Sequence, residues 1–333
     1  MTEQLVDLRR AYTGENLSQA APAVKHVLHD LPEDRRHRVA AALDTRTGDR
    51  VDSRRAGSGA GDPSDVRGLF LPDARTDDQR TLECVVLQSA TDASAHLQLK
   101  PPASMLRPAH VFRSVEPGDG LRVHLAEHAL GPLLYEALPR QEDRWVAGVA
   151  GLRVERHPRS VELRLLDLDA SVVLSGVDDE AWEVGMTYVR TLMRGRDLHG
   201  PLIDGPLSDA EREHLAEHPR PTGLGSAVLR RYHLFSRVPW LRSLPQADRW
   251  WLEWPESIGV ASVADRLLHP VFGVPNAVET PSAAGGLGLT TGWYDLYLRE
   301  VDPPDPAKED ALGAFEWPEG VTGWWEPPTR PVG

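Results

Sequence analysis

The stretch Ser160–Leu165, with the sequence SVELRL, indicates the fold class of this chain most directly. Its apolar residues alternate with Glu162 and Arg164. An alternation of period two is typical of a β-strand that has one buried and one hydrated face. The sequence therefore predicts a sheet with one solvent-facing side at this point.

The segments on either side of this strand extend the prediction. The sequence PGDG at 117–120 separates two alternating runs and favours a hairpin over 111–125. Helical spacing of apolar residues recurs at Asp77–Ala90, His128–Leu138 and Asp178–Met193. Strands grouped together, with helices beside them, are typical of an α+β architecture. We expect residues 1–198 to form an α+β domain, an antiparallel sheet with helices packed on one side, with a flexible loop at about residues 44–67.

The last third of the chain has a different composition. It is rich in proline and holds eight of the ten tryptophans: Trp240, Trp250, Trp251, Trp254, Trp293, Trp317, Trp324 and Trp325. Few runs of regular period occur there, although Trp293–Val301 alternates as one strand. The sequence therefore predicts a second domain over residues 199–333, a Trp/Pro-rich and largely irregular C-terminal region.

The composition restricts the classes of function. A net charge of −13 argues against sequence-independent binding of nucleic acid, because such binding requires clusters of basic residues that face the phosphates. No signal-peptide pattern and no long apolar run is present, so we expect no membrane contact and a cytoplasmic location, as in a soluble bacterial protein. The one cysteine, Cys84, lies on an apolar helix stripe, where a core thiol is expected.

The tryptophans suggest the leading functional hypothesis. Tryptophan buries about 200 Å² and is enriched where proteins bind one another. The candidate partner-binding residues are Trp250, Trp251, Trp254, Trp293, Trp324 and Trp325. They predict a non-catalytic binding or accessory protein that engages a protein or peptide partner through an aromatic-rich C-terminal surface. The alternative is that the rings pack against each other as a core.

A glycine-rich loop suggests a second hypothesis. Gly223, Gly225 and Ser226 precede a helix that carries Arg230, and backbone N–H groups at such a start can hold an anion. The loop predicts an anion- or phosphate-binding transferase, whereas the simpler interpretation is a turn capped by Ser226. The same arginine-rich segment suggests a third hypothesis, a DNA-associated regulator using Arg230, Arg231 and Arg237.

The pentapeptide HLAEH occurs at 124–128 and again at 214–218. Two histidines one helical turn apart, with a glutamate, resemble the metal-binding pattern of a zinc hydrolase, which also needs a third ligand. His214 and His218 are expected on a helix and are the candidate metal ligands, although a solvated helix face is the simpler interpretation. The first copy is expected to lie on a strand, which would separate its two histidines. The sequence predicts no cofactor and leaves the oligomeric state open.

Overall fold

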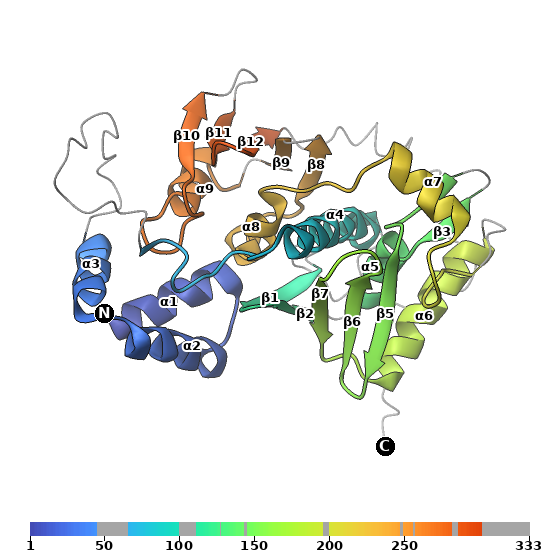
Figure 1. Ribbon diagram of the computed structural model, residues 1–333, viewed down its shortest axis with the longest axis horizontal. Coiled ribbons are helices and arrows are strands. Elements are labelled where there is room, and N and C mark those ends of the chain that lie inside the picture. The colour runs from blue at the N-terminus through green and yellow to red at the C-terminus, as the bar shows by residue number, and fades with distance from the viewer. Residues whose placement is uncertain are drawn as a thin grey trace.

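The chain folds into helices and two five-stranded sheets (Figure 1). The computed structural model describes residues 1–44, 66–99, 111–126, 128–142, 145–195, 200–246, 249–255, 257–281 and 286–301. The loop expected at about 44–67 lies almost entirely outside these residues. Trp317, Trp324 and Trp325 also lie outside them.

The α+β class is confirmed. The helices are α1 (Thr2–Thr13), α2 (Leu17–Asp30), α3 (Glu33–Asp44), α4 (Asp77–Leu99), α5 (Leu130–Ala137), α6 (Asp179–Arg194), α7 (Asp209–Glu217), α8 (Gly225–Leu229) and α9 (Val260–Leu267), with a 3-10 helix at Tyr232–Phe235. The strands are β1 (Phe112–Pro117), β2 (Leu121–Leu125), β3 (Arg140–Glu142), β4 (Trp145–Ala147), β5 (Leu152–His157), β6 (Ser160–Leu165), β7 (Ser171–Ser175), β8 (Arg242–Gln246), β9 (Arg249–Pro255), β10 (Val278–Pro281), β11 (Leu287–Thr290) and β12 (Asp295–Val301). Among the described residues, no helix is long and apolar enough to cross a membrane.

The first sheet has the order β1-β2-β7-β6-β5. The expected hairpin and the alternating strand β6 are both present, and Val161 and Leu163 are buried as their spacing requires. One part of the prediction is wrong, because β2 and β7 run parallel and the sheet is mixed. The alternation of side chains determines which face of a strand is buried, but it carries no information about strand direction.

A second sheet, with the order β10-β11-β12-β9-β8, lies within the C-terminal region. Its central pair, β9 and β12, is also parallel. As far as Val301 the described part of this region contains α7 to α9 and β8 to β12, while residues 302–333 lie outside it, so the largely irregular character stays a prediction. The Trp-rich strand β9 lies next to the central strand β12, and of its residues 250–255 all but Trp251 are buried.

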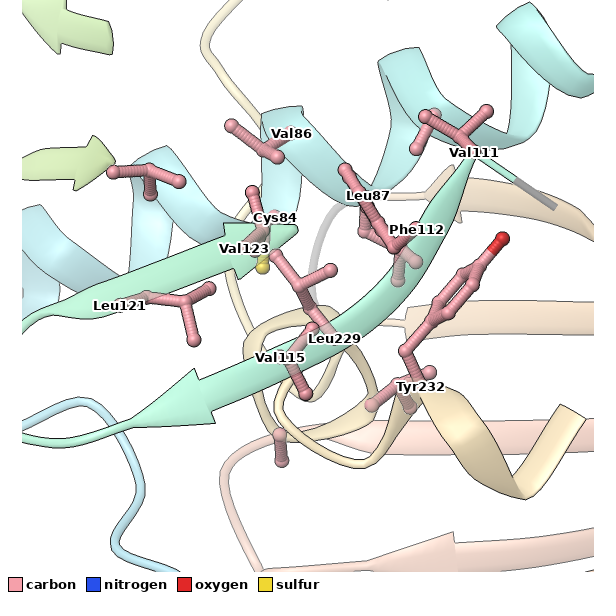
Figure 2. Packing of buried hydrophobic residues seen from close by; sticks show 14 of the residues in the cluster. Cys84, Val86, Leu87, Val111, Phe112, Val115, Leu121, Val123, Leu229 and Tyr232 are labelled. Carbon is pink, nitrogen blue, oxygen red and sulfur yellow. The ribbon is translucent and has the colours of Figure 1, made fainter. Parts of the chain in front are cut away.

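Helix α4 lies between the two sheets (Figure 1). Cys84 and Leu87 face the β1-β2 hairpin on one side, where Phe112 packs, and Leu229 and Tyr232 complete the same cluster (Figure 2). Thr91 contacts the second sheet through a 2.8 Å hydrogen bond between its Oγ1 and the Oγ of Ser243. Buried residues on both sides of position 198 therefore belong to one continuous core. The proposed domain boundary stays a prediction.

Helix ends follow the sequence signals. Gly14 ends α1 with a φ of 75°, a left-handed conformation that favours glycine. Ser208 caps α7 by accepting a hydrogen bond from the Glu211 N–H, and the Glu211 side chain accepts one from the Ser208 N–H. This reciprocal pair of hydrogen bonds is a capping box.

His269 predicts how stability depends on pH. Its Nδ1 accepts the N–H groups of Val271 and Phe272 at 3.1 and 3.2 Å, which requires the neutral ring. Burial, with a smaller effect from the charge of Arg67, lowers the pKa of His269 from 6.5 to about 4. A depressed histidine pKa stabilises the fold above the unfolded value, and this contribution is lost as the pH falls from about 6.5 to about 4.

We therefore expect the free energy of unfolding to decrease over this pH window, and His269→Asn to reduce the decrease. Asparagine keeps a side-chain acceptor but does not titrate. Urea unfolding of both proteins between about pH 7 and about pH 4.5 measures the difference. Burial also lowers the pKa values of His214 and His233, so part of the slope should remain. Equal slopes in both proteins would contradict the role of His269.

Candidate functional site

Trp251, Tyr297 and Arg299, on β9 and β12, contact one another. Together with Trp293, in the turn that leads into β12, we call them the aromatic patch. Tyr297 lies directly opposite Trp251 in the parallel β9-β12 pair. Their rings stack with centroids 4.5 Å apart and an interplanar angle of 26°. The guanidinium carbon of Arg299 lies 5.9 Å from the Trp251 ring centroid, and Arg299 also forms an ion pair with Glu253.

The strands place these rings on the outer face because alternate residues point to opposite sides. On β12, Leu296 and Leu298 are fully buried, so Tyr297 between them faces outward. On β9, Trp250 is buried while Trp251 is partly exposed. In both strands, one residue of each adjacent pair thus points into the core and the next points toward solvent.

Trp293 is the most exposed of the predicted binding residues that the structure describes. It lies in the tight turn between β11 and β12, beside Gly292, whose φ of 87° favours glycine. Its exposed fraction is 86%. A side chain at the tip of a hairpin does not pack in the core. The fold therefore does not require a large apolar ring at position 293.

Two predicted partner-binding residues belong to the core instead. Trp250 is 1% exposed and Trp254 is 0% exposed. Trp254 packs edge-on against Phe235 and donates its indole N–H to the Ile258 carbonyl at 3.0 Å. A Cβ on Gly225 would lie 2.8 Å from the Trp250 ring, so glycine is required there for packing. Trp324 and Trp325, the last two candidates, lie outside the described residues.

The Gly223–Ser226 loop does receive an anionic group, but that group is the chain's own Glu83. Ser226 Oγ donates to Glu83 at 2.6 Å, and Arg230 donates to both carboxylate oxygens at 2.8 and 2.6 Å. The side chains of Glu83 and Arg230 are fully buried. Of the four residues predicted to bind an anion, Ser226 and Arg230 thus hold an internal carboxylate, whereas anion binding by Gly223 and Gly225 stays a prediction.

The DNA-regulator hypothesis depends on arginines that are free to contact phosphates, and two of its three arginines are buried. Arg231 is also fully buried and donates to Asp73 at 2.6 Å and to the Phe272 carbonyl at 2.9 Å. Of the three arginines, Arg237 alone is exposed. Guanidinium groups that are buried in internal ion pairs cannot contact phosphates.

His214 and His218 lie on and directly after α7, as expected. Their rings stack with centroids 4.9 Å apart. Burial, followed by the charge of His218, lowers the pKa of His214. Among the described residues, three metal-ligating groups gather only at Glu155, His157 and Glu162, so no third ligand joins the α7 histidines within that part of the chain.

The first HLAEH copy begins on β2, as expected, with His124 and Leu125, and the expected separation of its two histidines stays a prediction. The strand ends at Leu125, and His128 adopts a φ of 64°. The chain turns there, so that His124 and His128 line the same cavity. Spacing along a strand gave no indication of this turn.

Two members of the aromatic patch were not among the sequence candidates. Tyr297 and Arg299 follow Trp293 by four and six residues in the alternating segment Trp293–Val301, which the sequence predicts to be a strand. Residues at this spacing lie on the same face of a strand. That alternation was the signal that could have identified them. No protein-family model, curated protein or solved structure matches the chain, so the geometry alone must indicate the function.

Proposed function

We propose that this chain is a non-catalytic, cytoplasmic binding protein that engages a protein or peptide partner through the aromatic patch. The observation that supports it is Trp293, which is 86% exposed at a hairpin tip that leads into the strand of the stacked Tyr297. Trp, Tyr and Arg are the residue types that dominate binding energy at protein interfaces. All three occur together in this patch.

The stacked pair is well suited to binding because it is held in place before a partner arrives. Trp251 is fixed by Tyr297 on the neighbouring strand and by the guanidinium of Arg299. Ordering a side chain on binding costs about 0.5–1.5 kcal/mol, which a preordered ring largely avoids. The flat aromatic surface also suits proline rings, since extended proline-rich segments bind to aromatic-lined surfaces.

The charges around the patch indicate what kind of segment fits. Strand pairing places Arg242, Arg249 and Arg299 on the same side as Glu253 and Asp295. The guanidinium groups outnumber the carboxylates, which favours a partner segment with a small negative charge. We therefore propose an extended segment that contains proline or aromatic residues and a few acidic ones.

The test removes the two accessible tryptophans. We expect Trp251→Ala and Trp293→Ala each to weaken capture of the partner from a lysate of the source cells by about ten-fold or more, since truncating a hot-spot tryptophan costs about 2 kcal/mol or more. Titration calorimetry with the purified partner then measures the loss. The fold should survive, because both side chains are on the solvent side.

Trp145→Ala is the matched control. Trp145 is 55% exposed but lies on β4, in another sheet. Its removal should leave capture unchanged. The proposal fails if Trp251→Ala and Trp293→Ala retain the affinity of the unmodified chain, or if the Trp145 variant loses as much.

A further inference from the structure

The outer face of the second sheet carries a row of residues that the described part of the chain leaves partly open to solvent. Strand pairing places one residue of each strand in this row, in the order Thr280, Gly288, Tyr297, Trp251 and Leu244. Trp251, Tyr297 and Leu244 are each partly exposed, whereas Leu252 and Leu296 on the opposite face are buried. Stacked aromatic rings that keep one face in solvent are a surface on which proline and indole rings pack well.

One side of this row is positively charged. Arg242 and Arg299 lie on the two strands that flank β9, and both pair with the same carboxylate, that of Glu253. The Glu253 side chain is 6% exposed, while those of Arg242 and Arg299 are 64% and 40% exposed. One carboxylate cannot neutralise two guanidinium groups, so a positive charge remains at the surface beside the Trp251 ring. This charge favours an occupant that carries acidic residues.

The chain itself continues from this face into a segment of matching composition. Strand β12, which carries Tyr297 and Arg299, is the last described element and ends at Val301 (Figure 1). The sequence that follows, residues 302–333, holds seven acidic residues and two basic ones. Within it, residues 316–326 have the sequence EWPEGVTGWWE, with three tryptophans, one proline, three glutamates and no basic residue. These residue types suit both the apolar row and the positive charge beside it.

The short tether favours this segment over any free peptide. Fourteen residues, 302–315, separate it from the end of β12. An extended chain covers about 3.3 Å per residue, so this tether reaches about 46 Å. Neighbouring strands lie about 4.8 Å apart, so a five-stranded sheet is only about 19 Å across. A tether of this kind holds its end at an effective concentration of about 1 mM, so a contact with a Kd of about 0.1 mM would be occupied about 90% of the time.

From these observations we infer that residues 316–326 bind the aromatic patch of their own chain. The indole and proline rings of the segment contact Trp251 and Tyr297, and its glutamates pair with Arg242 and Arg299. The inference rests on the proposed function for its binding surface and adds that an outside partner must displace the chain's own segment. With the segment bound about 90% of the time, the apparent Kd of that partner is raised about ten-fold.

Photo-cross-linking of the full chain tests this contact. Cys84 is the one cysteine of the sequence and is fully buried, so Gly323→Cys supplies an accessible thiol for a benzophenone label. We expect ultraviolet light to join the label to peptides of β8, β9 or β12 of the same chain, identified by mass spectrometry. Adding Trp251→Ala should lower the yield at least about two-fold, because the loss of a hot-spot tryptophan weakens the contact.

Two double variants in the same segment of sequence provide a matched comparison. Glu319→Gln with Glu326→Gln should lower the cross-linking yield at low salt, because it removes two of the three glutamates of residues 316–326. Glu309→Gln with Asp310→Asn removes the same charge from the tether and should leave the yield unchanged. Equal losses in the two double variants would contradict the assignment of residues 316–326 as the occupant.

Cross-links that map away from the outer face, or that join two chains into a dimer on a denaturing gel, would overturn the inference. An unchanged yield in the Trp251→Ala chain would overturn it as well. Trp324→Ala with Trp325→Ala should strengthen capture of the outside partner several-fold by removing its competitor, and weaker capture would contradict this.

The two proposals fail separately. Cross-links on the outer face, combined with full partner capture by Trp251→Ala, would leave the internal contact standing and reject the proposed partner-binding role. Capture that is lost in Trp251→Ala, without any cross-link to the outer face, would leave the proposed function standing and reject the internal contact.

Discussion

Glu83→Ala is expected to lower the free energy of unfolding by about 3–5 kcal/mol, because it leaves the Arg230 guanidinium buried without its counter-charge. Ser226 Oγ and the amide of Gln79 lose their acceptor at the same time. Whole domains are stable by only about 5–15 kcal/mol, so this loss is a large fraction of the total. Denaturant unfolding of the full chain measures it.

A graded series keeps this prediction testable even if Glu83→Ala folds poorly. Ser226→Ala removes only one hydrogen bond to the carboxylate and should cost about 1.5–3 kcal/mol. The double variant Glu83→Ala with Arg230→Ala should cost less than the sum of the two single variants, since the second change removes a charge that is already unpaired.

Asp209→Ala is the control, because its pair with Arg212 is exposed and such pairs contribute about 0–1 kcal/mol. A Glu83→Ala loss as small as that of Asp209→Ala would show that the buried pair does not stabilise the fold.

The pairing of Glu83 with Arg230 could not be predicted from the sequence. Ser226 and Arg230, two of the residues that the sequence predicts to hold an anion, bind the carboxylate of Glu83. Glu83 lies 147 residues before Arg230, and no local pattern connects the two. Pairing of distant residues is decided by tertiary packing, so an internal carboxylate and an external phosphate could not be distinguished from the sequence.

The same limit applies to the sheets. Alternation in β6 predicts which of its side chains are buried, and Val161 and Leu163 are buried as expected. Strand order and direction depend on long-range pairing, as between β2 and β7, which are about fifty residues apart in the chain. The cavity at His124 arises from that parallel pair and was therefore not predictable.

The second large effect is expected in the core of the other sheet. Trp250→Ala and Trp254→Ala should each cost about 3–5 kcal/mol, the usual loss when a buried tryptophan is truncated. Denaturant unfolding again provides the measurement. Trp293→Ala is the control and should change stability by less than about 0.5 kcal/mol, because its ring is at the surface.

Phenylalanine substitutions should separate the two buried rings. The indole N–H of Trp254 donates to Ile258, whereas that of Trp250 has no hydrogen-bond partner among the described residues. Trp254→Phe removes this hydrogen bond and leaves the Ile258 carbonyl without its donor. Trp250→Phe instead removes a buried N–H that has no acceptor in the described part of the chain and that lowers the stability of the folded chain by about 1–3 kcal/mol. Trp254→Phe should therefore be the more destabilising by about 1–3 kcal/mol. If Trp250→Phe costs as much, then the Trp250 indole must be hydrogen-bonded in the folded chain, and its place in the core would need another explanation.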